Sequence, residues 1–337
     1  MAATPRLEEW MRLSKERLRD TDIMMEYILD LYEFPPNFSP PQDLGNDILI
    51  ERVDIHHWPL YRISTRSSLG TMLYCHGGDF VNEIVSQHYQ LAAQIAREAE
   101  ISVLVPIYPL LPRPTARFEQ VVSGLCKIVA IRHFNITSIA GDSAGGTLAM
   151  LTMQRLIRIQ SPCASRIKSL MLISPLLDCS LSHPESINLE PDDPWLGIDG
   201  LHLAARLFNR DPVTLIPWIE RADPNVSPLF GNIADLPATL LLSGTRDLLC
   251  ADARRLSARF RNGDTSENAE EWIAGSVELE GFKYVEAEDM LHVWPLMASP
   301  EGAEAREVIL DFLRKHKRVT RILQEQKVQD QATGIGR

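Results

Sequence analysis

The hexapeptide Gly-Asp-Ser-Ala-Gly-Gly at residues 141–146 constrains the fold of this chain more than any other feature. An apolar, β-branched run at 136–140 precedes it, and a run typical of a helix follows at 147–153. The order is therefore strand, tight turn and helix. Glycines around Ser143 permit a sharp turn that lifts its hydroxyl above the sheet edge and seats the next amide at a helix N-terminus. We interpret Ser143 as a nucleophile rather than a helix N-cap, because an N-cap does not require flanking glycines.

A second glycine motif lies upstream, where the apolar run 72–75 leads into His76-Gly77-Gly78-Asp79-Phe80. Paired glycines after a strand let backbone N–H groups turn toward one point, as an oxyanion hole requires. The predicted oxyanion-hole residues are Gly77, Gly78, Asp79 and Ala144, with the amides of the last three as donors. We expect His76 to brace this loop by hydrogen bonds, and Asp142 to support the turn at Ser143.

An acid and a histidine follow the serine along the chain. Asp247 ends the strand-like run 238–244, and His292 follows a second such run at 282–287. The order serine, aspartate, histidine is the one that the α/β-hydrolase fold uses. Asp252 is an alternative acid, but Asp247 is favoured because it stands at the end of a predicted strand.

These motifs together resemble the hormone-sensitive-lipase-like group of α/β-hydrolases. The matching segments are His76–Gly78, Tyr108–Pro112, Gly141–Gly146, Ser227–Leu229, Gly244–Asp247 and His292–Trp294. The resemblance implies carboxylesterase, lipase, lactonase or deacetylase chemistry. It also implies a cap over the active site, built from N-terminal helices and an insertion.

The chain departs from this group at two places. Many members have a third glycine where this chain has Asp79. If only the amide of Asp79 is used, we expect its carboxylate to point away from the oxyanion and to be held by a neighbour. If the carboxylate lies in the pocket, it would oppose an oxyanion and attract a cationic or hydroxylated substrate group. The stretch from Asp247 to His292 is also long for the group. We expect its polar segment 261–268 to form a surface loop.

Strand-like and helix-like segments alternate along most of the chain, which predicts an α/β fold with a mostly parallel sheet and helices on both faces. The expected strands are Thr71–Cys75, Ser102–Ile107, Ile136–Ala140, Ser169–Ser174, Thr239–Ser243 and Lys283–Ala287. We expect an N-terminal helical part of the cap at 1–45, a catalytic domain at 46–315 with a cap insertion at about 178–225, and a helix end with a flexible tail at 316–337. The apolar residues predicted to line the substrate pocket are Phe80, Trp195, Leu203, Phe208 and Val293; packing of the cap onto the core is the alternative for each.

Composition excludes several classes of protein. The 337 residues carry a net charge of -11, which disfavours nonspecific binding to nucleic acid or to an anionic membrane. The N-terminus does not read as a signal peptide, and no run approaches membrane-spanning length. The five cysteines show no close pairing or metal-like spacing, so we expect a reducing, cytoplasmic location. Whether the chain forms a homodimer is left open.

The sequence thus predicts a serine hydrolase that cleaves a short to medium acyl ester, an acetyl ester or a lactone of a small apolar molecule, and that needs no metal or cofactor. A thioesterase or amidase is an alternative, since the same triad serves these substrates. A non-catalytic receptor is the other alternative, as in plant gibberellin receptors, which resemble this group but lack the histidine. His292 stands at the expected place and favours an enzyme.

Overall fold

The computed structural model describes residues 5–33, 37–210, 223–263, 272 and 274–332. The α-helices of this part are α1 (Pro5–Leu18), α2 (Thr21–Asp30), α3 (Ser86–Glu98), α4 (Phe118–Ala130), α5 (Ser143–Arg158), α6 (Pro184–Leu189), α7 (Ile198–Phe208), α8 (Cys250–Asn262) and α9 (Pro300–Ala332). The strands are β1 (Leu49–Ile55), β2 (Trp58–Ser64), β3 (Thr71–Cys75), β4 (Ser102–Pro106), β5 (Ile136–Asp142), β6 (Ser169–Ile173), β7 (Ala238–Arg246), β8 (Val277–Leu279) and β9 (Phe282–Leu291).

Within the described residues, one sheet has the strand order β1-β2-β4-β3-β5-β6-β7-β9-β8. Neighbours from β4 to β9 pair in parallel, while β1, β2 and β8 join the edges antiparallel. The mostly parallel sheet predicted from the sequence is therefore confirmed. The antiparallel strands β1, β2 and β8 were not predicted, and β1 is largely exposed, so its residues carry little of the apolar signal that marks a core strand.

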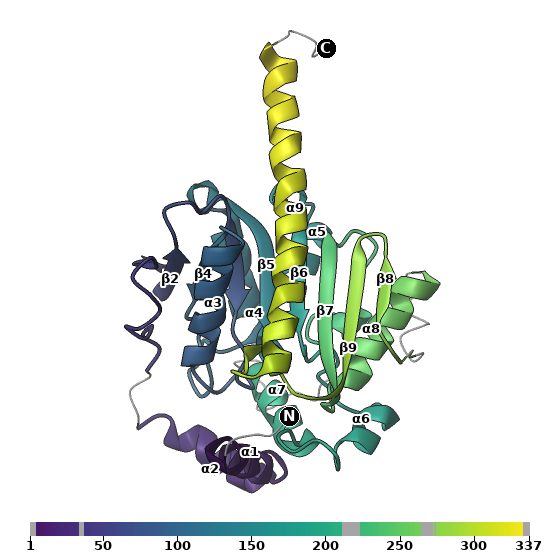
Figure 1. Cartoon of the computed structure of the whole chain (residues 1–337). Coiled ribbons are helices and arrows are strands. Elements are labelled where there is room, and N and C mark those ends of the chain that lie inside the picture. Colours follow the sequence, from purple (N-terminus) through teal and green to yellow (C-terminus); the bar gives the residue numbers. More distant parts are fainter. Residues whose placement is uncertain (1–4, 34–36, 211–222, 264–271, 273, 333–337) are drawn as a thin grey trace.

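Helices cover both faces of the sheet, as the alternation of segments predicts. Met72 and Tyr74 of β3 face a buried cluster with α3 and α9, while Leu73 and Cys75 face a second cluster with α4 and α5. Successive residues of a strand point to opposite faces, so a run buried on both faces becomes continuously apolar. In Figure 1, α3 and α9 lie in front of the sheet.

The carboxyl ends of the parallel strands bring the sequence motifs to one edge of the sheet. His76 follows β3, Ser143 follows β5, Asp247 follows β7 and His292 follows β9. The helices α1, α2, α6 and α7 gather at this end of the molecule (Figure 1), and both α1 and α2 contact α7.

The structure adds detail to the expectation for three segments. The helical pattern at the N-terminus is two helices, because Asp20 caps α2 by accepting from the amides of Asp22 and Ile23. At the other terminus α9 runs as one helix to Ala332 and extends past the body (Figure 1). Of the expected loop at 261–268, the first two residues belong to α8 and 264–268 lie outside the described residues. No helix of the described part is long and apolar enough to cross a membrane.

Candidate active site

Ser143 stands at a strained turn between β5 and α5. Its φ is 51°, in the left-handed region that residues other than glycine rarely adopt. Holding the backbone there costs about 1–3 kcal/mol. The neighbouring glycines permit this turn by close approach: a Cβ on Gly141 would lie 2.3 Å from the carbonyl oxygen of Gly145, and one on Gly145 would lie 2.1 Å from that of Cys75. The first amides of α5, including that of Ala144, have no acceptor within the helix and point beyond its N-terminus.

Ser143, His292 and Asp247 form a continuous hydrogen-bonded chain. The Nε2 atom of His292 lies 2.9 Å from Ser143 Oγ, and its Nδ1 atom lies 2.8 Å from Asp247 Oδ2. The other oxygen of Asp247 accepts from the amide of Leu249 at 2.9 Å, which fixes the carboxylate. All three side chains are buried. The arrangement allows His292 to take the serine proton while Asp247 holds the ring.

The charges around His292 favour its protonated form. Burial alone would lower the pKa of the imidazole, but the carboxylates of Asp247, Asp193 and Asp79 outweigh it and leave the pKa raised. An imidazolium formed when a nucleophile loses its proton would be stabilised in the same way.

Asp252, the alternative acid, lies in a different network. Its Oδ2 atom accepts from the amide of Asp178 at 2.9 Å, and its Oδ1 atom lies 3.0 Å from Arg255. Burial, partly offset by Arg255, raises the pKa of Asp252 to about 7. The carboxylate therefore joins α8 to the segment after β6 and makes no contact with His292.

Asp142 connects the serine turn to the glycine loop. Its Oδ1 atom accepts from Tyr74 Oη at 2.6 Å and from the amide of Gly77 at 3.0 Å, while its Oδ2 atom lies 3.2 Å from His88 Nε2. Burial would raise the pKa of this carboxyl, but His88 and Tyr74 outweigh it and hold the pKa below its usual value. Because Gly77 donates to Asp142, its amide is directed at the serine turn, and its lack of a side chain allows the two segments to meet.

The remaining loop residues turn tightly. Gly78, Asp79 and Phe80 all have positive φ, of 124°, 59° and 62°. His76 braces the loop: its Nδ1 atom lies 2.6 Å from Gly77 O, and Tyr108 stacks on the ring at 4.6 Å. Burial and His88 lower the pKa of His76 to about 4, so it is neutral near pH 7.

The Asp79 carboxylate is buried and held by a neighbour. Its side chain accepts from Asn82 Nδ2 at 3.3 Å, and Asn82 in turn accepts from Tyr27 Oη of α2 at 2.5 Å. Burial raises the pKa of Asp79, against the positive charges of Arg17 and His292. The carboxylate is thus linked through Asn82 to α2 while staying within electrostatic reach of His292.

The residues predicted to line the pocket fall into two groups. Phe80 and Phe208 are fully buried and stack on each other at 4.6 Å, so they pack α7 onto the glycine loop. Val293 is buried in the cluster with α9, and Leu203 packs against the opposite cluster. Trp195 alone of the five has a ring contact with His292, edge-on at 5.4 Å between centroids.

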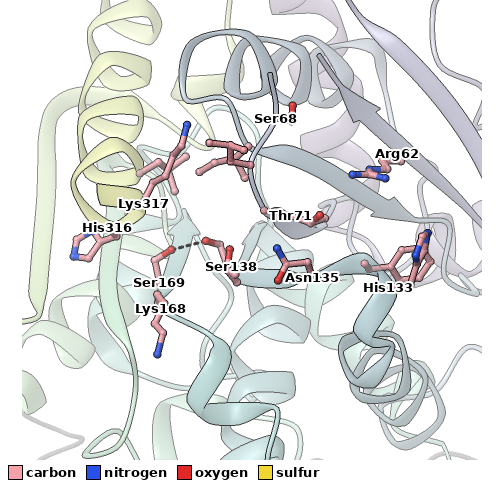
Figure 2. Close-up of a pocket in the computed structure, with 16 residues that line it drawn as sticks. Arg62, Ser68, Thr71, His133, Asn135, Ser138, Lys168, Ser169, His316 and Lys317 are labelled. Atoms are coloured by element: carbon pink, nitrogen blue, oxygen red, sulfur yellow. Dashed lines mark hydrogen bonds between the residues drawn. The ribbon is translucent and has the colours of Figure 1, made fainter. Parts of the chain in front are cut away.

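A hollow of about 540 Å³ lies at the far end of the sheet from this site. Figure 2 shows it between the starts of β3 and β6 and the helix α9, with the bonded hydroxyls of Ser138 and Ser169 at its centre. Both of its lysines bond nearby chain atoms: Lys168 donates to Ser165 O, and Lys317 donates to Ala99 O and to Glu100. Ser143, Asp247 and His292 follow the carboxyl ends of their strands, so this hollow is separate from the candidate site.

Sequence reasoning did not single out Asp193, which accepts from the amide of Leu248 at 2.9 Å, directly after Asp247 in the chain. The only local signal is an acid before Pro194, which favours a turn. Sequence reasoning also missed Asn82, which bonds Asp79, and His88, which bonds Asp142.

A family model described as alpha/beta hydrolase fold matches residues 72–273, which is more than half of the chain. The chain belongs to this family. The crystal structure of an esterase from the bacterial hormone-sensitive lipase family superposes on this α/β-hydrolase with a TM-score of 0.67 at 25% identity, over 94% of this chain and 99% of that one. The resemblance to the hormone-sensitive-lipase-like group is thereby confirmed.

Two bacterial relatives of this α/β-hydrolase carry names of ester-cleaving proteins. An acetyl-hydrolase of Streptomyces hygroscopicus is 27% identical over 251 residues, covering 72% of this chain and 75% of that protein. An esterase of Acinetobacter venetianus is 26% identical over 201 residues, covering 59% of this chain. This chain spans 63% of the length of that esterase.

Proposed function

We propose that this chain is a serine esterase that cleaves carboxylic esters through an acyl-enzyme. The observation that carries the proposal is the buried chain from Ser143 Oγ through His292 to Asp247, with separations of 2.9 and 2.8 Å. The relatives named esterase and acetyl-hydrolase support the same chemistry.

The reaction follows from the roles of these groups. Ser143 Oγ attacks the ester carbonyl carbon while His292 Nε2 takes the serine proton, and Asp247 stabilises the resulting imidazolium. The amides of Gly78, Asp79 and Ala144 donate to the oxyanion, each such donor being worth about 3 kcal/mol of barrier. His292 returns the proton to the leaving alcohol, and water then releases the acid by the same steps in reverse order.

We propose short to medium acyl esters, acetyl esters included, or lactones as the substrates. Phe80 and Phe208 occupy the space between the glycine loop and α7 with their own stacked rings, and Trp195 covers the edge of His292. Side chains that fill this space favour a small acyl group over a long one. A hydrogen-bonded His292 argues against a receptor that has lost catalysis.

The test is hydrolysis of p-nitrophenyl esters of increasing acyl length, beside a thioester and an anilide of the preferred acyl group. We expect the highest kcat/KM on esters of short to medium acyl length. Replacing either Ser143 or His292 with alanine should lower kcat by several orders of magnitude. The double variant should be little worse than either single one, because the two residues act as a unit. Faster turnover of long-chain emulsified triacylglycerol, or of the thioester or anilide, would contradict the proposed substrate class. Tight binding without hydrolysis would indicate a receptor.

A further inference from the structure

Helix α1 reaches His292 through an aromatic pair. Trp10 of α1 packs edge-on against Trp195 at 4.7 Å between ring centroids, and Trp195 in turn packs edge-on against His292 at 5.4 Å. Trp195 lies in the segment 190–197, between α6 and α7, which we call the cap loop. The position of the cap loop therefore decides what covers the imidazole.

Lys15 of α1 holds the cap loop by its main chain. Its Nζ atom donates to the carbonyl oxygens of Glu190 and Asp193 at 2.7 Å each and to that of Leu196. An ammonium has three N–H donors, so these carbonyls use all of them. Burial lowers the pKa of Lys15, against the attraction of the acids at 190 and 193. Lys15 therefore links α1 to the cap loop, two segments that lie about 175 positions apart in the sequence.

Asp193 joins the cap loop to the triad acid. Its Oδ1 atom accepts from the amides of Trp195 and Leu196 at 2.8 and 2.9 Å, which shapes the loop. Its Oδ2 atom accepts from the amide of Leu248 at 2.9 Å. Since Leu248 directly follows Asp247, the carboxylate of a cap residue fixes the backbone that presents the triad acid.

We propose that Lys15 and Asp193 are positioning residues for the triad, through which helix α1 sets the placement of Trp195 over His292 and of Asp247 beside it. This inference rests on the proposed esterase function. The N-terminal helices are accordingly part of the machinery that sets kcat, in addition to any contact they make with substrate.

Asp193 also acts on His292 by its charge. The negative charges of three carboxylates raise the pKa of the imidazole: those of Asp247 after β7, Asp193 in the cap loop and Asp79 in the glycine loop. Burial and the negative charge of Asp247 raise the pKa of Asp193 to about 6, and Lys15 is the cation beside it, so Asp193 is mostly ionised above neutral pH. Removing this charge lowers the pKa of His292. A residue that served only for packing would not have this effect.

The experiment compares kcat, KM and the pH profile of kcat/KM on p-nitrophenyl butyrate for the full chain and four variants. Lys15→Met should lower kcat roughly 10- to 100-fold with a smaller change in KM, because displacement of catalytic groups by about 1 Å costs this much. Asp193→Asn should lower kcat and move the acid limb of the profile to lower pH. Arg12→Met is the matched control, since Arg12 is on α1 but pairs with Glu16 at the surface, and it should leave all three readouts unchanged.

Two results would overturn the inference. One is a Lys15→Met variant in which KM rises and kcat is kept, because α1 then serves binding alone. The other is an Asp193→Asn variant whose acid limb stays in place. Near-ultraviolet circular dichroism of each variant separates loss of the fold from loss of positioning, and Lys15→Arg, which keeps the charge but not the three-way geometry, should also lower kcat.

Failure of the proposed function is a separate outcome. If the unaltered chain hydrolyses no ester, the rate at which a fluorophosphonate modifies Ser143 replaces kcat as the readout, since this reaction needs His292 but no ester. Slower modification of Lys15→Met than of Arg12→Met upholds the positioning role. Equal rates overturn it.

Discussion

Gly145 is the position at which one added methyl group should most directly damage the proposed oxyanion hole. Its Cβ would lie 2.1 Å from the carbonyl oxygen of Cys75 and 2.3 Å from that of His76, both backbone atoms at the end of β3. Contacts of this kind are not seen under 3.0 Å, so α5 and the end of β3 must separate by roughly 0.9 Å. That shift moves the amide of Ala144 away from those of Gly78 and Asp79.

We therefore expect Gly145→Ala to lower kcat by about 100-fold, the typical effect of a 1 Å misplacement. Overpacking should also cost about 1–3 kcal/mol in the free energy of unfolding. Steady-state hydrolysis of p-nitrophenyl butyrate and urea unfolding measure the two quantities. Gly146→Ala is the control, because its Cβ would meet the side chain of Pro175 at 2.7 Å rather than β3. It should lose stability with a smaller loss of kcat. A folded Gly145→Ala protein with unchanged kcat would refute this reasoning.

Three further predictions follow from the charged groups. Asp247→Asn should lower kcat by roughly 10³- to 10⁴-fold. Asp252→Asn weakens a buried contact with Arg255 and should mainly reduce the free energy of unfolding, by roughly 1–3 kcal/mol. Kinetics and urea unfolding of both variants decide between the two acids. His292 must be neutral to act as the base, and its pKa is raised above 6.5, the value of an unperturbed imidazole. We therefore expect kcat/KM to be at its maximum at high pH and to fall as the pH drops through a midpoint above 6.5. A lower midpoint would contradict this. Asp79→Asn should leave the ranking of neutral, anionic and cationic short esters unchanged, and a changed ranking would mean that the carboxylate faces the substrate.

The sequence predicts those parts of the site that are local in the chain. The strand, glycine and helix order around Ser143 is a property of one short segment, and the glycine motif at 76–78 is another. Asp193 was not found because its role depends on a hydrogen bond from the amide of Leu248, 55 positions away. The role of Lys15 depends on carbonyl groups about 175 positions along the chain. Carbonyl acceptors carry no signal in a sequence.

The aromatic residues predicted to line the pocket show a second kind of limit. An apolar residue has the same signature in the sequence whether it lines a pocket or packs against the core. Phe80 and Phe208 lie within the core, stacked on each other, while Trp195 lies at His292. The difference arises from how α7 meets the glycine loop, and this depends on packing between distant segments.

The most direct test of the central claim is covalent labelling of the full chain with a fluorophosphonate, followed by intact mass measurement and peptide mapping. If Ser143 is the nucleophile, the protein gains one phosphonyl group, the modified peptide contains Ser143, and labelling disappears together with ester hydrolysis in Ser143→Ala. Labelling at another residue, or hydrolysis that survives in a folded Ser143→Ala protein, would contradict the account.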